Sequence, residues 1–257
     1  MLYLGPPRDP GAPSVPRVAR ADLAPDWTAR CAALAAEARD PRLCAFYAAG
    51  APAGDTPLGQ VELVAVDVET TGLDPERDEI VSVGLVPFDL TRIRASASRH
   101  WIVRPRRALD AESVAVHGIT HSQVADAPDF TEVLGELLEQ LAGRVVVAHC
   151  APIERGFLAA ACRERLGEVL EFPAIDTMEL EARAHRQPPS VWAWLAGLFG
   201  RRAPVPSIRL AAARARYGLP RYRPHHAAVD ALAAAELLQA QVAHRYAADT
   251  SLAELWS

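Results

Sequence analysis

Two acidic residues at the end of an apolar strand constrain this chain more than any other feature. The run 61–66 has the composition of a buried strand, and it continues into Asp67 and Glu69. Because side chains of a strand alternate between faces, Asp67 and Glu69 share the face of Ala65, which is the core side. Like charges on that face repel and lose solvation, and a divalent cation would neutralise them. The pair therefore predicts a metal site, unless both acids simply face solvent at the strand end.

The other apolar runs predict an α/β domain around this strand. A turn at 70–72 follows the acids, and further strands are expected at 80–87, 99–103, 145–148 and in a short segment ending at Asp176. Helical spacing of apolar residues predicts helices at 130–141, about 151–166, 207–217 and about 226–246. Three successive strands, followed by strands that alternate with helices, predict a mixed five-stranded sheet flanked by helices.

The first 60 residues are expected to be an extension of the main domain, which we place at 61–250. Residues 1–21 are rich in proline, glycine and arginine and predict an arm, which two short helices and a linker follow. The apolar stretch 188–206 is expected to be an insertion packed on the domain, with an exposed docking patch as the alternative.

Neither export nor membrane insertion is indicated by the sequence. The first residues contain no apolar signal core, and no later run approaches the roughly 20 apolar residues of a spanning helix. The four cysteines show neither a CxxC pair nor the spacing of a zinc site. We therefore expect a cytoplasmic protein with reduced thiols and no membrane span.

Two further segments bring acids to the starts of predicted helices. Glu154 follows the strand at 145–148 and falls in the first turn of the next helix, where the helix dipole alone would favour an acid. Asp230 lies in an Ala-rich helix that must pack against the sheet, so its carboxylate needs a metal, an arginine or a backbone donor as partner. His225, just before that helix, has a side chain suited to general-base catalysis near neutral pH.

In their order and local amino-acid sequence these segments resemble the DEDD 3′–5′ exonucleases of the ribonuclease H-like superfamily, in the subgroup that contains a motif histidine. This family includes the proofreading epsilon subunit of bacterial DNA polymerase III, and the resemblance extends over roughly residues 61–243. The similar segments are 66–73 for the first motif, 146–158 for the second, 225–231 for the third, and the shorter pieces 116–120 and 176–177. Separate matches in the right order are far more specific than any one motif.

The resemblance implies a ribonuclease H-like fold and a metal-dependent 3′–5′ exonuclease that releases nucleoside monophosphates from DNA. The implied ligands of two divalent cations, Mg²⁺ or Mn²⁺, are Asp67, Glu69, Glu154 and Asp230. Asp67 would be shared by both ions, and His225 would take the proton from the attacking water. The implied contacts to the substrate strand are the turn Thr70, Thr71 and Gly72, which would offer backbone donors, and His117. The expected partner is a single-stranded or frayed 3′ end, and a polymerase or another replication or repair protein is a further candidate.

The second motif departs from the family pattern, which usually reads His-Asn-Ala-x-Phe-Asp. Cys150 stands in place of the asparagine, and Glu154 stands in place of the aspartate, which keeps the carboxylate and adds one methylene. We expect Glu154 to serve as a ligand, directly or through water. The alternatives are an exoribonuclease for short RNA or RNA 3′ ends and, from another class, a catalytically weakened or silent nucleic-acid-binding module.

The distribution of charge along the chain fits a phosphodiester substrate better than the total charge does. The formal net charge is −5, with 11 arginines against 21 acids in residues 61–180 and 10 arginines against 5 acids in 181–257. Part of the acidity belongs to the expected metal ligands, and arginines elsewhere can follow a phosphate backbone. The total charge therefore does not exclude a nucleic-acid partner.

Overall fold

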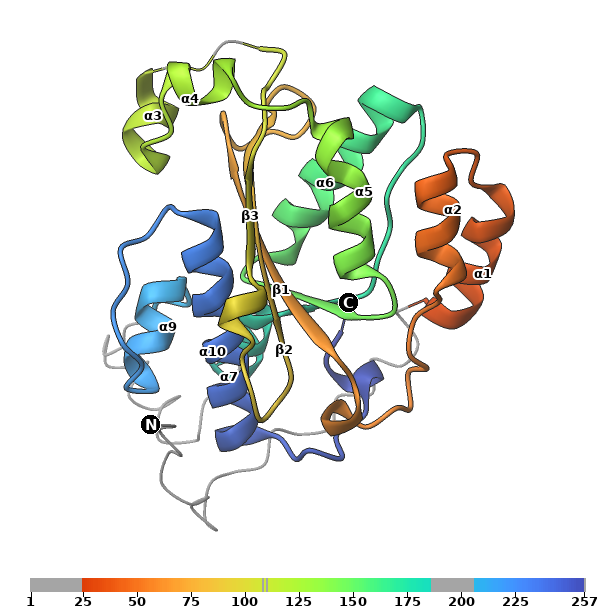
Figure 1. Ribbon diagram of the computed structural model, residues 1–257. Helices are drawn as coiled ribbons and strands as arrows, with labels where there is room; N and C mark the ends of the chain where they lie inside the picture. Colours follow the sequence, from red (N-terminus) through yellow and green to blue (C-terminus); the bar gives the residue numbers. More distant parts are fainter. Residues whose placement is uncertain (1–24, 108, 110, 186–205, 257) are drawn as a thin grey trace, which may run out of the picture.

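A mixed five-stranded sheet lies at the centre of the computed structural model, which describes residues 25–107, 109, 111–185 and 206–256 (Figure 1). The strands, in the spatial order β3-β2-β1-β4-β5, are β1 (Leu63–Thr70), β2 (Ile80–Phe88), β3 (Arg99–Ile102), β4 (Val145–Ala148) and β5 (Ala174–Asp176). β2 pairs antiparallel with β1 and β3, whereas β4 pairs parallel with β1 and β5. The predicted fold, a mixed five-stranded sheet flanked by helices, is confirmed.

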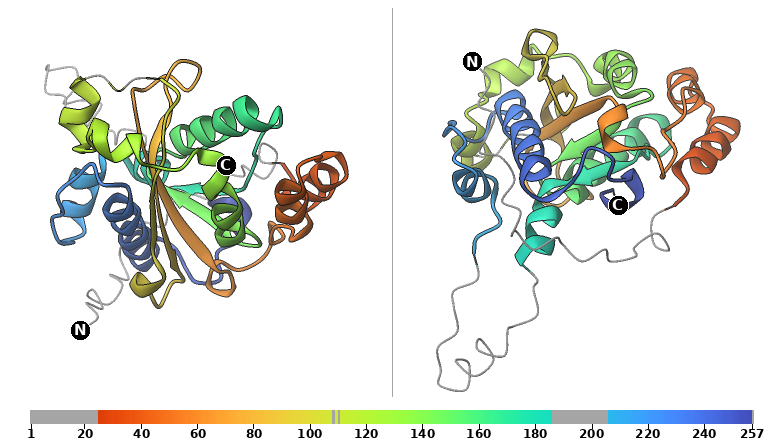
Figure 2. Two further views of the ribbon diagram at one scale, coloured as in Figure 1. Left: turned by 45° about the horizontal axis from the view of Figure 1, so that its top comes forward. Right: turned by 90° about the horizontal axis from the view of Figure 1, so that it is seen from below.

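Helices cover both faces of the sheet because β1 is apolar on both sides (Figure 2). The helices are α1 (Trp27–Glu37), α2 (Pro41–Ala48), α3 (Ala111–His117), α4 (His121–Ala125), α5 (Phe130–Leu141), α6 (Ala151–Leu166), α7 (Thr177–His185), α9 (Leu210–Arg216) and α10 (Ala227–Arg245). One core joins α5 and α6 to Val64 and Val66, and a second joins α10 to Leu63 and Ala65. Strand alternation places the two acids of β1 on the second face, toward α10.

The N-terminal helices α1 and α2 form a hairpin that shares a core with α5 and α6. Tyr47 of α2 is buried, and its hydroxyl donates to the carbonyl of Val169 and accepts the N–H of Glu171, both at 3.0 Å. Arg30 of α1 forms an ion pair with Glu171. The predicted helical extension is therefore confirmed, and it is fastened to the connection between α6 and β5.

The elements that carry the acids lie close to their predicted positions. β1 extends to Thr70, the first residue of the predicted turn, so Asp67 and Glu69 lie on the strand as expected. α10 runs from Ala227 to Arg245, within one residue of the predicted 226–246, and the φ of 66° at His225 prevents the helix from starting earlier. The helices α3, α4 and α7 were not predicted.

Two predicted segments, the arm at 1–21 and nearly all of the insertion at 188–206, lie outside the described residues. All four cysteines are free, as expected. Within the described ranges, none of the helices has both the length and the apolar character needed to cross a bilayer.

Candidate active site

Four carboxylates converge on one end of the sheet from three elements. Asp67 and Glu69 come from β1, Glu154 from the first turn of α6, and Asp230 from the first turn of α10. Burial raises the pKa of Asp67 well above its usual range. The carboxylates of Glu154, Asp230 and Glu69, in that order, raise the pKa of Asp67 further. The predicted ligand set is therefore brought together around Asp67.

Glu69, Asp230 and His225 form the tightest group in this site. One side-chain ligand atom of each lies within 4.8 Å of those of the other two. Burial, and then the charge of Asp230, raises the pKa of Glu69 to about 7. Burial also raises the pKa of Asp230, although the backbone N–H of His225 donates to its Oδ2 at 2.7 Å and opposes the rise.

His225 is held in a left-handed backbone conformation just before α10. Its φ is 66°, which is uncommon for any residue with a Cβ, and its side chain is exposed. The N–H bond to Asp230 fixes the backbone on one side, and His226, the N-cap of α10, stacks on His100 of β3 with ring centroids 4.5 Å apart on the other. The chain therefore presents the imidazole of His225 at the mouth of the carboxylate group.

A glycine in β2 allows α10 to approach the strand that carries the acids. Gly84 pairs with Asp67 across the β1–β2 ladder. A Cβ at Gly84 would lie 2.1 Å from the carbonyl carbon of Ala227 and 2.2 Å from the nitrogen of Ala228. The first turn of α10 therefore packs directly against the backbone of β2. The close contact sets the depth at which Asp230 enters the site.

Glu154 is the most secluded of the four acids. It is buried in α6, and its Oε2 has no hydrogen-bond partner among the described residues. Burial raises the pKa of Glu154 well above its usual range, and the carboxylate of Asp176 adds to the rise. A buried carboxylate oxygen without a partner is costly, so this atom requires a cation or a proton.

Asp176 fixes the helix that presents Glu154. Its Oδ1 and Oδ2 accept the N–H groups of Cys150 and Ala151 at 3.0 and 3.1 Å, at the start of α6. Oδ1 also accepts the N–H groups of Met178 and Glu179 at the start of α7. One carboxylate therefore caps two helices. The sequence marked Asp176 as the end of a short strand and as part of the 176–177 segment that resembles the family, and its capping role carried no separate signal.

The turn after β1 uses its own polar groups internally, which corrects one expectation. The N–H of Thr71 donates to the carbonyl of Glu79 at 2.9 Å, and the Thr71 hydroxyl accepts the N–H of Glu79 at 3.0 Å. Thr71 is buried, whereas Thr70 is half-buried and Leu73 is exposed. The backbone donor expected from Thr71 is therefore not free for a substrate, because it closes the turn.

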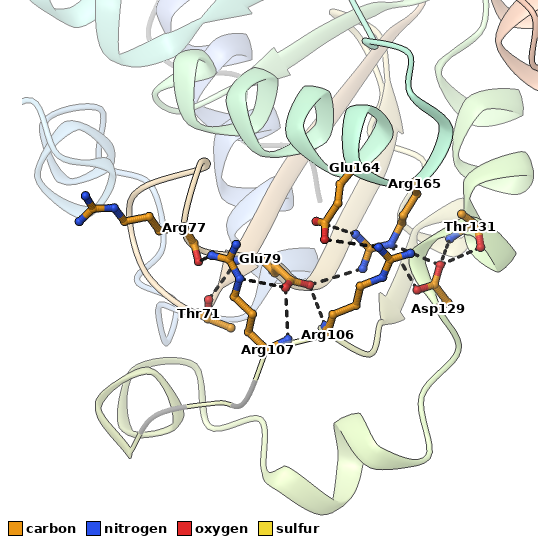
Figure 3. A network of polar contacts seen from close by, with 9 residues as sticks. All are labelled: Thr71, Arg77, Glu79, Arg106, Arg107, Asp129, Thr131, Glu164 and Arg165. Atoms are coloured by element: carbon orange, nitrogen blue, oxygen red, sulfur yellow. Dashed lines mark hydrogen bonds and ion pairs between the residues drawn. The ribbon is translucent and has the colours of Figure 1, made fainter.

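Glu79 ties this turn to two other parts of the chain (Figure 3). Its buried carboxylate accepts the backbone N–H groups of Arg106 and Arg107 at 2.7 and 3.2 Å. Arg165, near the end of α6, reaches the same carboxylate at 3.5 Å and Asp129 at 3.2 Å. The network holds the turn, the 104–107 segment and α6 together, and nothing in the local sequence distinguished Glu79 from surface acids.

His117 stands across a cavity from His225. Its Nδ1 accepts the N–H of Ile119 at 3.0 Å, just beyond the end of α3. Both histidines line a cavity of about 480 Å³. The structure therefore places His117 outside the carboxylate group but on the same side of the molecule.

The donor set of this site fits a divalent cation. Its carboxylate oxygens are the hard ligands that Mg²⁺ and Mn²⁺ prefer, and the mutual repulsion that raises the pKa of Asp67 is what a bound cation would remove. The unpartnered Oε2 of Glu154 points to the same requirement. Asp67, Glu69, Glu154 and Asp230 are thus suited to hold metal together.

Comparison with known proteins identifies the family. The exonuclease family model (RNase T) matches residues 64–238. The DNA polymerase III subunit epsilon of Treponema pallidum is 30% identical over 184 residues, which cover 72% of this chain and 78% of that protein. The chain belongs to the exonuclease family.

Two further likenesses have a narrower scope. A DNA polymerase III subunit epsilon-like protein of Rhodobacter capsulatus is 40% identical over 130 residues, which cover 50% of this chain but only 18% of that protein. The solved structure of exonuclease X in complex with 5′ overhanging duplex DNA has a TM-score of 0.52 at 24% identity, covering 70% of this chain and 90% of that one. The structural likeness shows the fold.

Gly84→Ala should displace the start of α10 and impair the site. The new methyl group would overlap the backbone of Ala227, and overpacking of this kind costs about 1–3 kcal/mol or more. We expect a lower free energy of unfolding in urea and weaker Mn²⁺ binding by calorimetry. Gly135→Ala is the matched control, because a Cβ there meets only Arg42 Cδ at 3.7 Å within a helix. Equal stability and Mn²⁺ affinity in the two variants would contradict the role of Gly84.

Asp67→Asn should stabilise the protein when no metal is present. Folding raises the pKa of Asp67 and, from 4.5 to about 7, that of Glu69, so their ionisation destabilises the folded state increasingly as the pH rises from about 4 through about 7. We expect the variant to raise Tm in EDTA at about pH 8, by roughly 2–4 °C for each kcal/mol of repulsion removed. Mn²⁺ should raise the Tm of the wild type far more than that of the variant. A variant Tm in EDTA at about pH 8 that equals or falls below that of the wild type would contradict the prediction.

Proposed function

We propose that this chain is a metal-dependent 3′–5′ exonuclease that releases nucleoside monophosphates from the 3′ end of DNA. The observation that supports this most is the convergence of four carboxylates with raised pKa values beside an exposed histidine. Carboxylates alone would fit a site that only binds cations. A histidine with a ligand atom within 4.8 Å of those of Glu69 and Asp230 adds a group that can accept a proton. The arrangement suits hydrolysis of a phosphodiester.

In this proposal each residue of the site has a distinct task. Two divalent cations, Mg²⁺ or Mn²⁺, when bound there would activate a water and stabilise the leaving 3′ oxygen. Asp67, Glu69, Glu154 and Asp230 would hold them. His225 would accept the proton of the attacking water, and its exposed ring could then pass that proton to solvent. Its left-handed backbone, bonded to Asp230, would keep the imidazole in place between turnovers.

The substrate strand would approach from the side of the turn after β1. Thr70, Thr71, Gly72 and His117 are the proposed contacts, with Thr71 acting by shaping the turn rather than by donating its N–H. DNA is the substrate we propose, since the compared structure contains duplex DNA and two relatives are described as epsilon or epsilon-like proteins. A polymerase partner, a cytoplasmic location and a domain boundary at residue 61 are part of the same proposal.

Asp67→Ala and Asp230→Ala should each abolish release of nucleotides while leaving the protein folded, because each removes a ligand from the metal site. His225→Ala should lower the rate by roughly 10²–10⁴-fold, as expected for loss of a general base. Glu139→Ala, which removes an exposed acid from α5, is the control and should keep the wild-type rate. The assay uses 5′-labelled single-stranded DNA, duplex DNA with a mismatched 3′ end, and RNA, each with Mg²⁺, with Mn²⁺ and with EDTA.

Three outcomes of this assay would change the proposal. Undiminished cleavage by Asp67→Ala or Asp230→Ala would refute the assigned site. A faster reaction on RNA than on DNA would identify an exoribonuclease instead. No cleavage by the wild type, together with no Mn²⁺ binding in a calorimetric titration, would identify a silent binding module.

Glu154→Asp should weaken metal-dependent activity rather than improve it. The start of α6 is fixed by Asp176, so a side chain shorter by one methylene would withdraw its carboxylate from the other acids. We expect the rate in Mg²⁺ to fall on the order of ten-fold or more, and the rate in Mn²⁺ to fall less, because Mg²⁺ demands a stricter geometry. Initial rates measured across a titration of each metal would show this. A rate in Mg²⁺ above that of the wild type would mean that Glu154 is a weakened ligand.

A further inference from the structure

A cavity of about 480 Å³ adjoins the proposed catalytic histidine. Its walls are residues 116–118 at the end of α3, the loop 222–226 before α10, and Val229 in the first turn of α10. Its volume falls within the range of pockets that hold small ligands, about 300–1,000 Å³. His225 lines it, so a molecule in the cavity would lie beside the site of hydrolysis.

Two of the exposed large hydrophobic side chains line this cavity. Four large hydrophobic side chains are exposed in the described part of the chain, namely Leu73, Val116, Val169 and Tyr222. Val116, with 50% of its surface exposed, and Tyr222, with 36%, both line the cavity. Arg223, also exposed, adds a positive charge at the same wall. Apolar walls with an arginine suit a ligand that has a flat ring and an anionic group.

Tyr222 is fixed from behind by two charged residues. The guanidinium of Arg214 lies over its ring, 4.6 Å from the centroid, and the Tyr222 hydroxyl donates to Glu236 Oε1 at 2.9 Å. Arg214 is itself buried and donates to Glu236 Oε2 at 2.7 Å. Arg214 also donates to the carbonyls of Ala233 at 2.7 Å and Pro220 at 2.9 Å, which ties the loop to α10. The ring is therefore preorganised, with one face on Arg214.

We propose that this cavity binds a nucleobase of the substrate strand next to the reacting nucleotide, with the base stacked on Tyr222 and Arg223 facing its phosphate. The proposal rests on the exonuclease activity proposed above. A base stacked on an aromatic ring is bound with little regard to sequence, which suits an enzyme that shortens any strand. Because Arg214 and Glu236 already fix the ring, stacking would cost little additional side-chain entropy. Tyr222 is thus a binding residue for the strand, not merely a brace for the His225 loop.

The two roles of Tyr222 are separated by comparing two variants. Tyr222→Phe keeps the ring but loses the bond to Glu236, whereas Tyr222→Ala loses the ring. If the base stacks on the ring, Tyr222→Ala should raise KM for a single-stranded oligonucleotide on the order of ten-fold, with a much smaller change in kcat. Tyr222→Phe should restore a KM near that of the wild type. Arg39→Ala, at an arginine whose side chain is 75% exposed between α1 and α2, is the control for a general loss of surface charge and is compared with Arg223→Ala.

The base itself is tested with oligonucleotides that carry a single abasic position, second, third or fourth from the 3′ end. In the wild type one of these positions should raise KM about as much as Tyr222→Ala does. In Tyr222→Ala the same abasic position should cause no further rise, because the ring and the base act as one contact. An equal abasic effect in both proteins would overturn the proposal. So would a wild-type KM in Tyr222→Ala, or a Tyr222→Phe variant as impaired as Tyr222→Ala.

Failure of the exonuclease proposal would be visible separately. If the wild type releases no nucleotide in Mg²⁺ or Mn²⁺, the activity is refuted, and the same variants and abasic oligonucleotides are then compared by fluorescence anisotropy in EDTA. A ten-fold weaker Kd for Tyr222→Ala, absent with the abasic strand, would still support the base site. Equal Kd values would refute it.

Discussion

Mutual repulsion among carboxylates at the end of β1 is the constraint on which the rest of the structure depends. Asp67 lies in a strand whose other residues, except the half-buried Thr70, are buried, and burial followed by the charges of three further acids raises its pKa. Such a group destabilises the fold, so it persists only where surrounding contacts over-determine its position. Two contacts hold the acids in position. Gly84 lets α10 pack closely against the strand, and Asp176 anchors the start of α6.

These two contacts explain why the four acids come from elements that are far apart in the sequence. A parallel pair, β1 and β4, brings the end of one strand beside the start of α6, which delivers Glu154. An antiparallel pair, β1 and β2, brings Gly84 beside Asp67 and thereby fixes α10 with Asp230. The mixed sheet is thus required by the site, because each direction of pairing contributes one of the two outer ligands.

The sequence predicted the parts of this arrangement that depend on local pattern. Alternation along β1 was enough to place Asp67 and Glu69 on one face, and apolar spacing located the strand at 145–148 and the helix at 130–141 to the residue. Contacts between backbone segments that are far apart in the sequence produce no such pattern in it. The overlap that forbids a side chain at Gly84, the double cap at Asp176 and the buried role of Glu79 all depend on which segments meet in space. The turn at Thr71 was misjudged for the same reason, since its partner Glu79 lies on the far side of the loop.

The departures in the second motif are consistent with one another in the folded chain. Cys150 has a φ of 89°, and its side chain makes no capping bond, so the start of α6 lacks the help that a side-chain cap would give. Asp176 supplies that help from β5 by accepting two N–H groups at the same helix start. The backbone that presents Glu154 is therefore held from outside the motif. The longer side chain of Glu154 then extends from a fixed backbone. Its unpartnered Oε2 is the atom that the additional methylene makes available as a ligand.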